Sequence, residues 1–89
     1  MLIVIYDYVD FCSVKSITSK ALRKKLGQRI KQIRKGQKIS QAQLAFESGI
    51  SREEVYRLEL GNQNVTVDVL HSIASSLDIH IKELYDFDY

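Results

Sequence analysis

Apolar residues recur along this chain at the three- and four-residue spacing that is typical of amphipathic helices. Five such stripes follow one another, separated by short polar segments, and no internal repeat is present. The inward-facing residues of the five helices are expected to be, in order, Leu22, Leu26, Ile30 and Ile33; Leu44 and Ala45; Val55 and Leu58; Val69, Leu70, Ile73, Ala74 and Leu77; and Ile81, Leu84 and Tyr85. The first helix is expected over about 19–35. The pattern predicts a compact all-α domain.

Start signals for two of the helices lie within the segment SQAQLAFESGISREEVYRLELG. Ser40 with Gln43, and Ser51 with Glu54, fit the capping box, in which a hydroxyl takes the backbone N–H three residues on. Gly49 stands between the two starts, where the chain must turn and a left-handed backbone is tolerated. The segment therefore predicts two short helices joined by a tight turn, which is a helix-turn-helix. Thr66 and His80 are the expected starts of the last two helices.

The formal net charge is only +2, so it does not indicate a charged partner. The distribution of the charges along the chain is more informative. Segment 19–38 carries basic residues and no acid, whereas 60–89 is acidic apart from Lys82. A segment with one sign of charge beside a helix-turn-helix favours a surface that faces phosphate over an ordinary solvated helix. The basic residues are Lys20, Arg23, Lys24, Lys25, Arg29, Lys31, Arg34, Lys35 and Lys38.

Candidate chemistry is sparse in the 89 residues. Cys12, His71 and His80 do not form a metal-binding cluster, so we expect no metal and no cofactor. No Ser/His/Asp set, paired-carboxylate pocket or glycine-rich phosphate loop is visible, so an enzyme is not expected. One cysteine fits a reducing, cytoplasmic location, and no apolar run approaches the roughly 18 residues of a membrane span.

The first 18 residues differ from the rest of the chain. The run LIVIYDYVDF is rich in β-branched and aromatic residues and predicts a strand. This N-terminal extension, 1–18, is expected either to pair with its twin in a dimer, to pack on the helices, or to stay disordered. Cys12 within it is expected as a reduced thiol or, on oxidation, as an intermolecular disulfide. Segment 19–89 is then expected to form the helical domain that contains the helix-turn-helix.

The chain from about Leu26 to Phe87 resembles the helix-turn-helix family of phage repressors, Cro proteins and XRE-type regulators. The residues that carry the resemblance are Arg34, Ser40, Gln41, Leu44, Ala45, Gly49, Val55, Leu58, Glu59, Gly61, Asn64, Thr66, Leu70, Ile73, Ala74 and Leu77. Val65 departs from the pattern, since the family often has proline there, and Glu53 and Glu54 bring two acids into the third helix. The resemblance implies a five-helix, lambda-repressor-like domain that binds double-stranded DNA as a homodimer through its third helix.

Helix geometry then assigns candidate roles on the third helix. With Val55 and Leu58 inward, the outer face or ends carry the candidates for base contacts, which are Arg52, Glu53, Tyr56 and Arg57. Arginine can bind guanine and glutamate can accept from cytosine, so a half-site containing G·C pairs is expected. For the arginines the alternative is a phosphate or solvent contact, for Glu53 an interaction with the helix dipole, and for Tyr56 a place over the core.

Candidates for phosphate contacts surround this helix: Gln41, Lys38, Lys35, Arg29 and Ser51. Gln41 opens the second helix, where an exposed helix N-terminus can hold a phosphate. Arg34 and Glu59 resemble the family's buried ion pair between the first and third helices, which is a structural role.

Apolar residues near the C-terminus exceed what so small a domain is expected to bury, and they predict a dimer interface. They are Ile79, Ile81, Leu84, Tyr85 and Phe87. The sequence thus predicts a sequence-specific transcriptional regulator that acts as a homodimer on a near-palindromic operator. A controller protein of a restriction–modification system fits its size best. The alternative is an antitoxin whose main surface masks a toxin partner.

Overall fold

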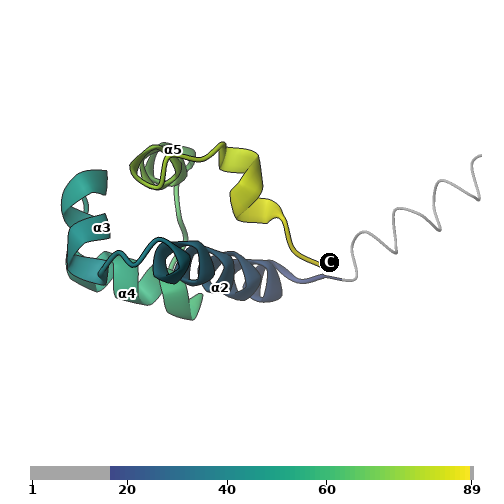
Figure 1. Ribbon diagram of the computed structural model, residues 1–89. Helices are drawn as coiled ribbons and strands as arrows, with labels where there is room; N and C mark the ends of the chain where they lie inside the picture. Colours follow the sequence, from purple (N-terminus) through teal and green to yellow (C-terminus); the bar gives the residue numbers. More distant parts are fainter. Residues whose placement is uncertain (1–16, 89) are drawn as a thin grey trace, which may run out of the picture.

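The computed structural model describes residues 17–88, and every regular element in this range is helical (Figure 1). The elements are α2 (Ser19–Gly36), α3 (Gln41–Ser48), α4 (Arg52–Leu60), α5 (Val67–Ser76) and the 3₁₀ helix η1 (Ile81–Tyr85). The all-α class is confirmed, with the difference that the fifth helix is a 3₁₀ turn. The strand expected in LIVIYDYVDF, and Cys12, lie outside the described residues.

Each α-helix begins at a hydroxyl residue whose side chain accepts a backbone N–H three residues later. The distances from the hydroxyl oxygens of Thr18, Ser40, Ser51 and Thr66 to these nitrogens are 3.0–3.1 Å. At Ser51 the predicted capping box is complete, because the Glu54 carboxylate accepts from the Ser51 N–H in return. His80 precedes η1 without a side-chain cap. The start signals at Ser40, Ser51 and Thr66 are therefore confirmed, although Gln43 does not complete the capping box predicted at Ser40.

Two glycines end the helices of the helix-turn-helix in the left-handed conformation. Gly49 follows α3 with φ 74°, and Gly61 follows α4 with φ 78°. Side-chain-bearing residues adopt this conformation only at a cost, so glycine is the favoured residue at both positions. The turn predicted at Gly49 is confirmed.

The core lies between α2, α4, α5 and η1, with α3 closing one end. Its buried apolar residues are Leu26, Ile30, Leu44, Ala45, Val55, Leu58, Leu70, Ile73, Ala74, Leu77 and Leu84. Of the last predicted helix only Leu84 is fully buried, since a short 3₁₀ turn directs few side chains inward. The inward stripes of the four α-helices otherwise agree with the expected ones, apart from Leu22, Ile33 and Val69, which are half-buried.

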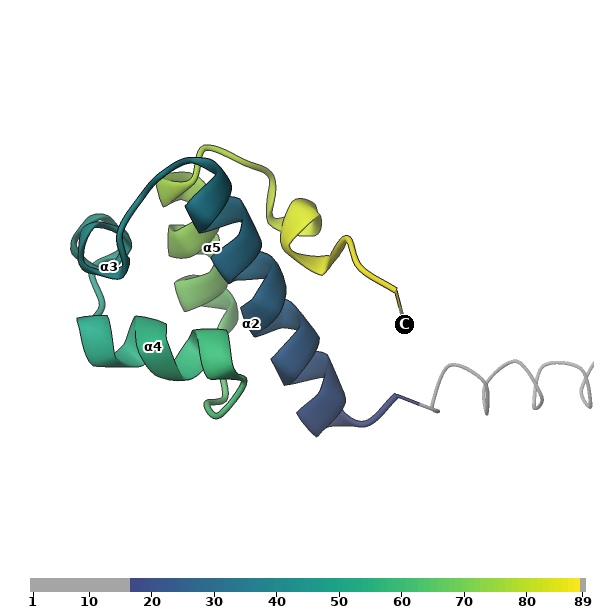
Figure 2. The same cartoon turned by 60° about the horizontal axis from the view of Figure 1, so that its bottom comes forward.

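The helix-turn-helix and the C-terminal segment occupy opposite ends of the domain (Figures 1 and 2). In Figure 2, α3 and α4 lie on one side of α2 and η1 lies on the other, with α5 behind. α2 contacts both α4 and η1, and α5 contacts both α3 and η1, so these two helices connect the ends. None of the helices described is long and apolar enough to cross a membrane.

Candidate nucleic-acid interface

Helix α4 is fixed against α2 by backbone contacts at two glycines. A Cβ added to Gly27 would lie 2.2 Å from the carbonyl oxygen of Leu58, which is too close for any side chain. A Cβ on Gly61 would lie 2.6 Å from the Cα of Lys24. Sequence reasoning missed Gly27, although a glycine inside a helix pattern, costing about 1 kcal/mol against alanine, is a signal of a packing role.

The predicted ion pair between α2 and α4 is present and buried. Arg34 is 7% exposed and Glu59 is 6% exposed. The guanidinium donates from Nε to Glu59 Oε2 at 2.7 Å and from Nη2 to Oε1 at 3.0 Å, which is a bidentate pair. Its Nη1 donates to the Ile39 carbonyl at 2.8 Å, so the same side chain also fixes the chain leading into α3. The pair therefore joins α2, α4 and the segment between α2 and α3.

Gln41, the first residue of α3, is connected to this ion pair. Its Nε2 donates to Glu59 Oε1 at 3.0 Å, and the residue is half-buried. An amide has a second N–H and a carbonyl oxygen, so Gln41 keeps one donor for a ligand while the buried carboxylate holds its side chain in place. The orientation of the candidate phosphate contact is thus set from inside the domain.

All four candidates for base contacts lie exposed on α4, while Val55 and Leu58 are buried beneath them. Tyr56 is 52% exposed and lies at the surface, not over the core. The structure brings base and phosphate candidates together in a shallow hollow lined by Gln41, Arg52, Glu53 and Tyr56. Arg57 Nη2 lies 3.0 Å from Glu53 Oε1, one helical turn away. Ser51, also exposed, is occupied as the cap of this helix.

Of the basic residues predicted to contact phosphate, Lys35 and Lys38 lie where α2 leads into α3, whereas Arg29 contacts the C-terminal segment. Lys35 and Lys38 are exposed where α2 leads into α3, and Lys38 has a φ of 60°, which is unfavourable for lysine. Arg29 points the other way and contacts the C-terminal segment, contrary to its predicted role at a phosphate. Its Nε donates to the Glu83 carbonyl at 2.9 Å, and its Nη2 lies 3.8 Å from an Asp86 oxygen. Arg29 therefore holds η1 against α2, because it lies on the side of α2 that faces the C-terminal segment.

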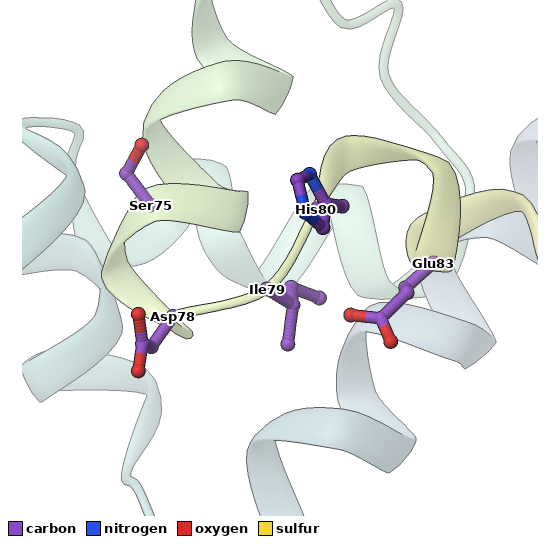
Figure 3. A pocket seen from close by; sticks show the side chains of 5 residues that line it. All are labelled: Ser75, Asp78, Ile79, His80 and Glu83. Atoms are coloured by element: carbon purple, nitrogen blue, oxygen red, sulfur yellow. The ribbon is translucent and has the colours of Figure 1, made fainter.

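The predicted dimer face is smaller than the sequence suggested. Leu84 is 0% exposed, so its assignment to an interface was wrong: it closes the core instead. Ile79, Tyr85 and Phe87 are half-buried against the core, and Ile81 is 37% exposed. Figure 3 shows the adjacent hollow, in which Ile79 lies between the carboxylates of Asp78 and Glu83, with His80 beside it.

Three apolar side chains that are more exposed than Ile81 lie elsewhere and were not predicted. Phe46 on α3 is 87% exposed, Val67 at the start of α5 is 74% exposed, and Leu60 at the end of α4 is 45% exposed. The spacing of apolar residues does not tell an exposed residue from a buried one. Single exposed apolar residues are common on protein surfaces.

Comparison with known proteins agrees with this architecture. The family model described as Helix-turn-helix matches residues 30–84. The chain is 36% identical over 67 residues to the control protein C.BamHI of Bacillus amyloliquefaciens, covering 74% of this chain and 83% of that one. It is 36% identical over 59 residues to the immunity repressor protein of Bacillus phage phi105, covering 66% of this chain and 41% of the repressor.

Among solved structures, the restriction-modification controller protein C.AhdI from Aeromonas hydrophila is similar, with a TM-score of 0.69 and 39% sequence identity. The match covers 70% of this chain and 94% of that one. The likeness therefore extends over nearly the whole of a controller protein, in sequence and in fold. The chain belongs to the helix-turn-helix family of DNA-binding transcriptional regulators, the family that also holds the restriction–modification controller proteins.

Proposed function

We propose that this protein is a transcriptional regulator of the controller type, which binds a near-palindromic DNA site as a homodimer. The observation that carries the proposal is the outer face of α4, where Arg52, Glu53, Tyr56 and Arg57 are all exposed on a helix held by the glycine contacts and the buried ion pair. A rigid helix with exposed polar side chains suits direct reading of base edges. The similarity to C.BamHI and C.AhdI supports the controller assignment.

In this docking, the first turn of α4 enters the major groove and α3 crosses the backbone. Arg52 and Glu53 lie in that first turn and reach base edges. Gln41 opens α3 and binds a phosphate, together with the backbone N–H groups of the helix start. The ion pair beneath Gln41 keeps the two contacts in a fixed relation.

Lys35 and Lys38 supply further phosphate contacts where α2 meets α3. Both are exposed, and no acidic residue occurs in 19–38 to neutralise them. Phosphate contacts from lysine release counterions, so affinity falls steeply with salt. They add affinity for any duplex and leave the choice of sequence to α4.

The dimer in this proposal forms through the C-terminal segment, so that 19–89 carries both DNA binding and dimerisation. Ile81 is the most exposed apolar side chain of this segment, and Ile79, Tyr85 and Phe87 contribute half-buried apolar surface. A two-fold pair places the two recognition helices about 34 Å apart, which is one turn of DNA. The contact lies at the end of the domain opposite α3 and α4, so dimerisation leaves the DNA face free (Figure 2).

Ile81→Asp tests the dimer contact, because it introduces a charge where apolar surface is buried against a second copy. Sedimentation of the variant is expected to give a monomer with an unchanged circular dichroism spectrum. Val67→Asp is the matched control, since Val67 is more exposed and lies outside the segment. A variant at Ile81 that remains dimeric contradicts the interface.

Selection from a random duplex pool tests the function itself. The proposal predicts sites with two-fold symmetry and half-site centres about one helical turn apart. Recovery of all sequences alike contradicts it. Neither the site nor the named relatives support the antitoxin alternative.

A further inference from the structure

An ion pair lies on the surface of α4 that the proposed function turns toward DNA. Arg57 Nη2 and Glu53 Oε1 are 3.0 Å apart, and the side chains are 46% and 74% exposed. Both residues point outward from the same side of the helix, since they are one turn apart. Arg52 and Tyr56 of the same helix are exposed as well.

A carboxylate on this surface needs an explanation. Glu53 faces a groove lined with phosphates, where a free negative charge is repelled. An exposed pair of this kind stabilises a helix by only about 0.2–0.5 kcal/mol, beside the weak dipole interaction of an acid in the first turn. Pairing with Arg57 cancels the charge of Glu53 and lets it approach DNA without net repulsion.

The atoms of the pair match one kind of base pair. The major-groove edge of a G·C pair presents, in order, the acceptors N7 and O6 of guanine and the N4 donor of cytosine. The Arg57 guanidinium offers two donors side by side, and the Glu53 carboxylate next to it offers an acceptor. We infer that Glu53 and Arg57 read one G·C pair in each half-site as a unit, an inference that rests on the proposed function.

The same pattern rejects the other base pairs. An A·T pair presents a donor between two acceptors, so it faces the arginine with a donor and the glutamate with an acceptor. A C·G pair presents the three groups in reverse order, so the preference is also for one orientation. Because the ion pair is neutral, it contributes sequence preference with little dependence on salt.

Selection from a random duplex pool, run with the wild type, Glu53→Gln, Arg57→Gln and the double variant, tests the inference. Each variant is expected to lose the preference at the same single G·C position of the half-site. The loss is about 5- to 150-fold in relative affinity at that position. The double variant loses no more than the larger single loss, because residues that act as a unit are not additive.

Control variants show whether a loss of preference comes from base contacts at these two residues or from a general change of charge. Thermal melts show whether it comes from a loss of folding. Glu47→Gln removes the same charge from an exposed site on α3 and is expected to leave every position unchanged. Arg52→Gln is expected to change a different position of the half-site. Thermal melts of the four α4 variants are expected to stay close to that of the wild type, since all the substituted side chains are exposed.

Losses at two different positions for Glu53→Gln and Arg57→Gln, or at none, overturn the inference while leaving the proposed function intact. Losses that add in the double variant also overturn it. A wild type that selects no sequence overturns the proposed function, which is a distinct result from either of these.

Discussion

The two ends of this domain present different surfaces on one core. At the helix-turn-helix end, charged and polar side chains are exposed on helices fixed by glycine contacts and a buried ion pair. At the C-terminal end, the 3₁₀ turn η1 is held by Arg29, whose Nε donates to the Glu83 carbonyl at 2.9 Å. Most apolar side chains there are turned inward.

The stabilising contacts of the domain differ between its two ends. The end proposed to read DNA needs side chains held in fixed positions relative to one another. The contacts that fix them are buried between α2 and α4, at Gly27, Gly61 and the Arg34–Glu59 pair. The end proposed to bind a second copy needs apolar surface, and it is attached by the buried Leu84 and by the Arg29 hydrogen bond. Removal of one partner of the buried ion pair is therefore expected to cost more than removal of the Arg29 hydrogen bond.

Removal of Arg34 is the most damaging change that we expect. Arg34→Ala leaves Glu59 buried and without its counter-charge, at a cost of about 3–5 kcal/mol. Thermal unfolding followed by circular dichroism measures the loss. The double variant Arg34→Met/Glu59→Leu is the control, and it is expected to recover much of the stability because neither buried charge remains. An unchanged melt for Arg34→Ala contradicts the role of the pair.

The contact of α2 with α4 is tested by a single added methyl group. Gly27→Ala places a Cβ against the backbone of α4 and is expected to cost about 1–3 kcal/mol of unfolding free energy in urea denaturation. Gly36→Ala is the matched control, because no atom lies within 4 Å of its Cβ position, and it is expected to stabilise the helix end slightly. Equal effects at both glycines contradict the close contact.

Arg29 and Lys35 separate the two ends in a DNA-binding measurement. Lys35→Gln is expected to lower the slope of log affinity against log salt by about 1, as for a phosphate contact. Arg29→Gln is expected to leave this slope unchanged and to cost about 1 kcal/mol of stability, because it loses a hydrogen bond to η1. A changed salt slope for Arg29→Gln contradicts this and indicates that Arg29 contacts phosphate.

The smallest effect is expected where the backbone is left-handed at residues other than glycine. Lys38→Gly relieves a φ of 60° and is expected to stabilise the fold by about 1 kcal/mol while weakening binding to every duplex. Asp78→Gly, at φ 56° near the other end, is the control. It is expected to gain less, since aspartate tolerates this conformation, and to leave DNA binding unchanged. Stronger DNA binding by Lys38→Gly contradicts a phosphate contact at this residue.

The sequence predicted the helix-turn-helix end well because its signals are local. Ser51 with Glu54, and Gly49, act on their own backbone within four residues, so spacing alone locates them. Arg34 and Glu59 were paired through the family resemblance, since nothing local joins residues 25 positions apart.

The C-terminal end was harder to predict. Its dimer face was predicted from the number of apolar residues in excess of what the core was expected to bury. Leu84 fits the core only when η1 folds back against α2 and α5, and a count of apolar residues cannot show that. The reach of Arg29 to Glu83 depends on the same placement. The contact at Gly27 depends on the distance between two helices, which periodicity does not encode.

If the α4 end reads sequence, the protein prefers one duplex over another of equal length, and two duplexes suffice to measure this preference. Fluorescence anisotropy with the wild type measures affinity for the selected palindrome and for a scrambled duplex of equal length between 50 and 200 mM salt. The account predicts affinity for the palindrome that is at least about 10³-fold higher, with affinity for both duplexes falling steeply as salt rises. Equal affinity for the two duplexes at every salt concentration contradicts it.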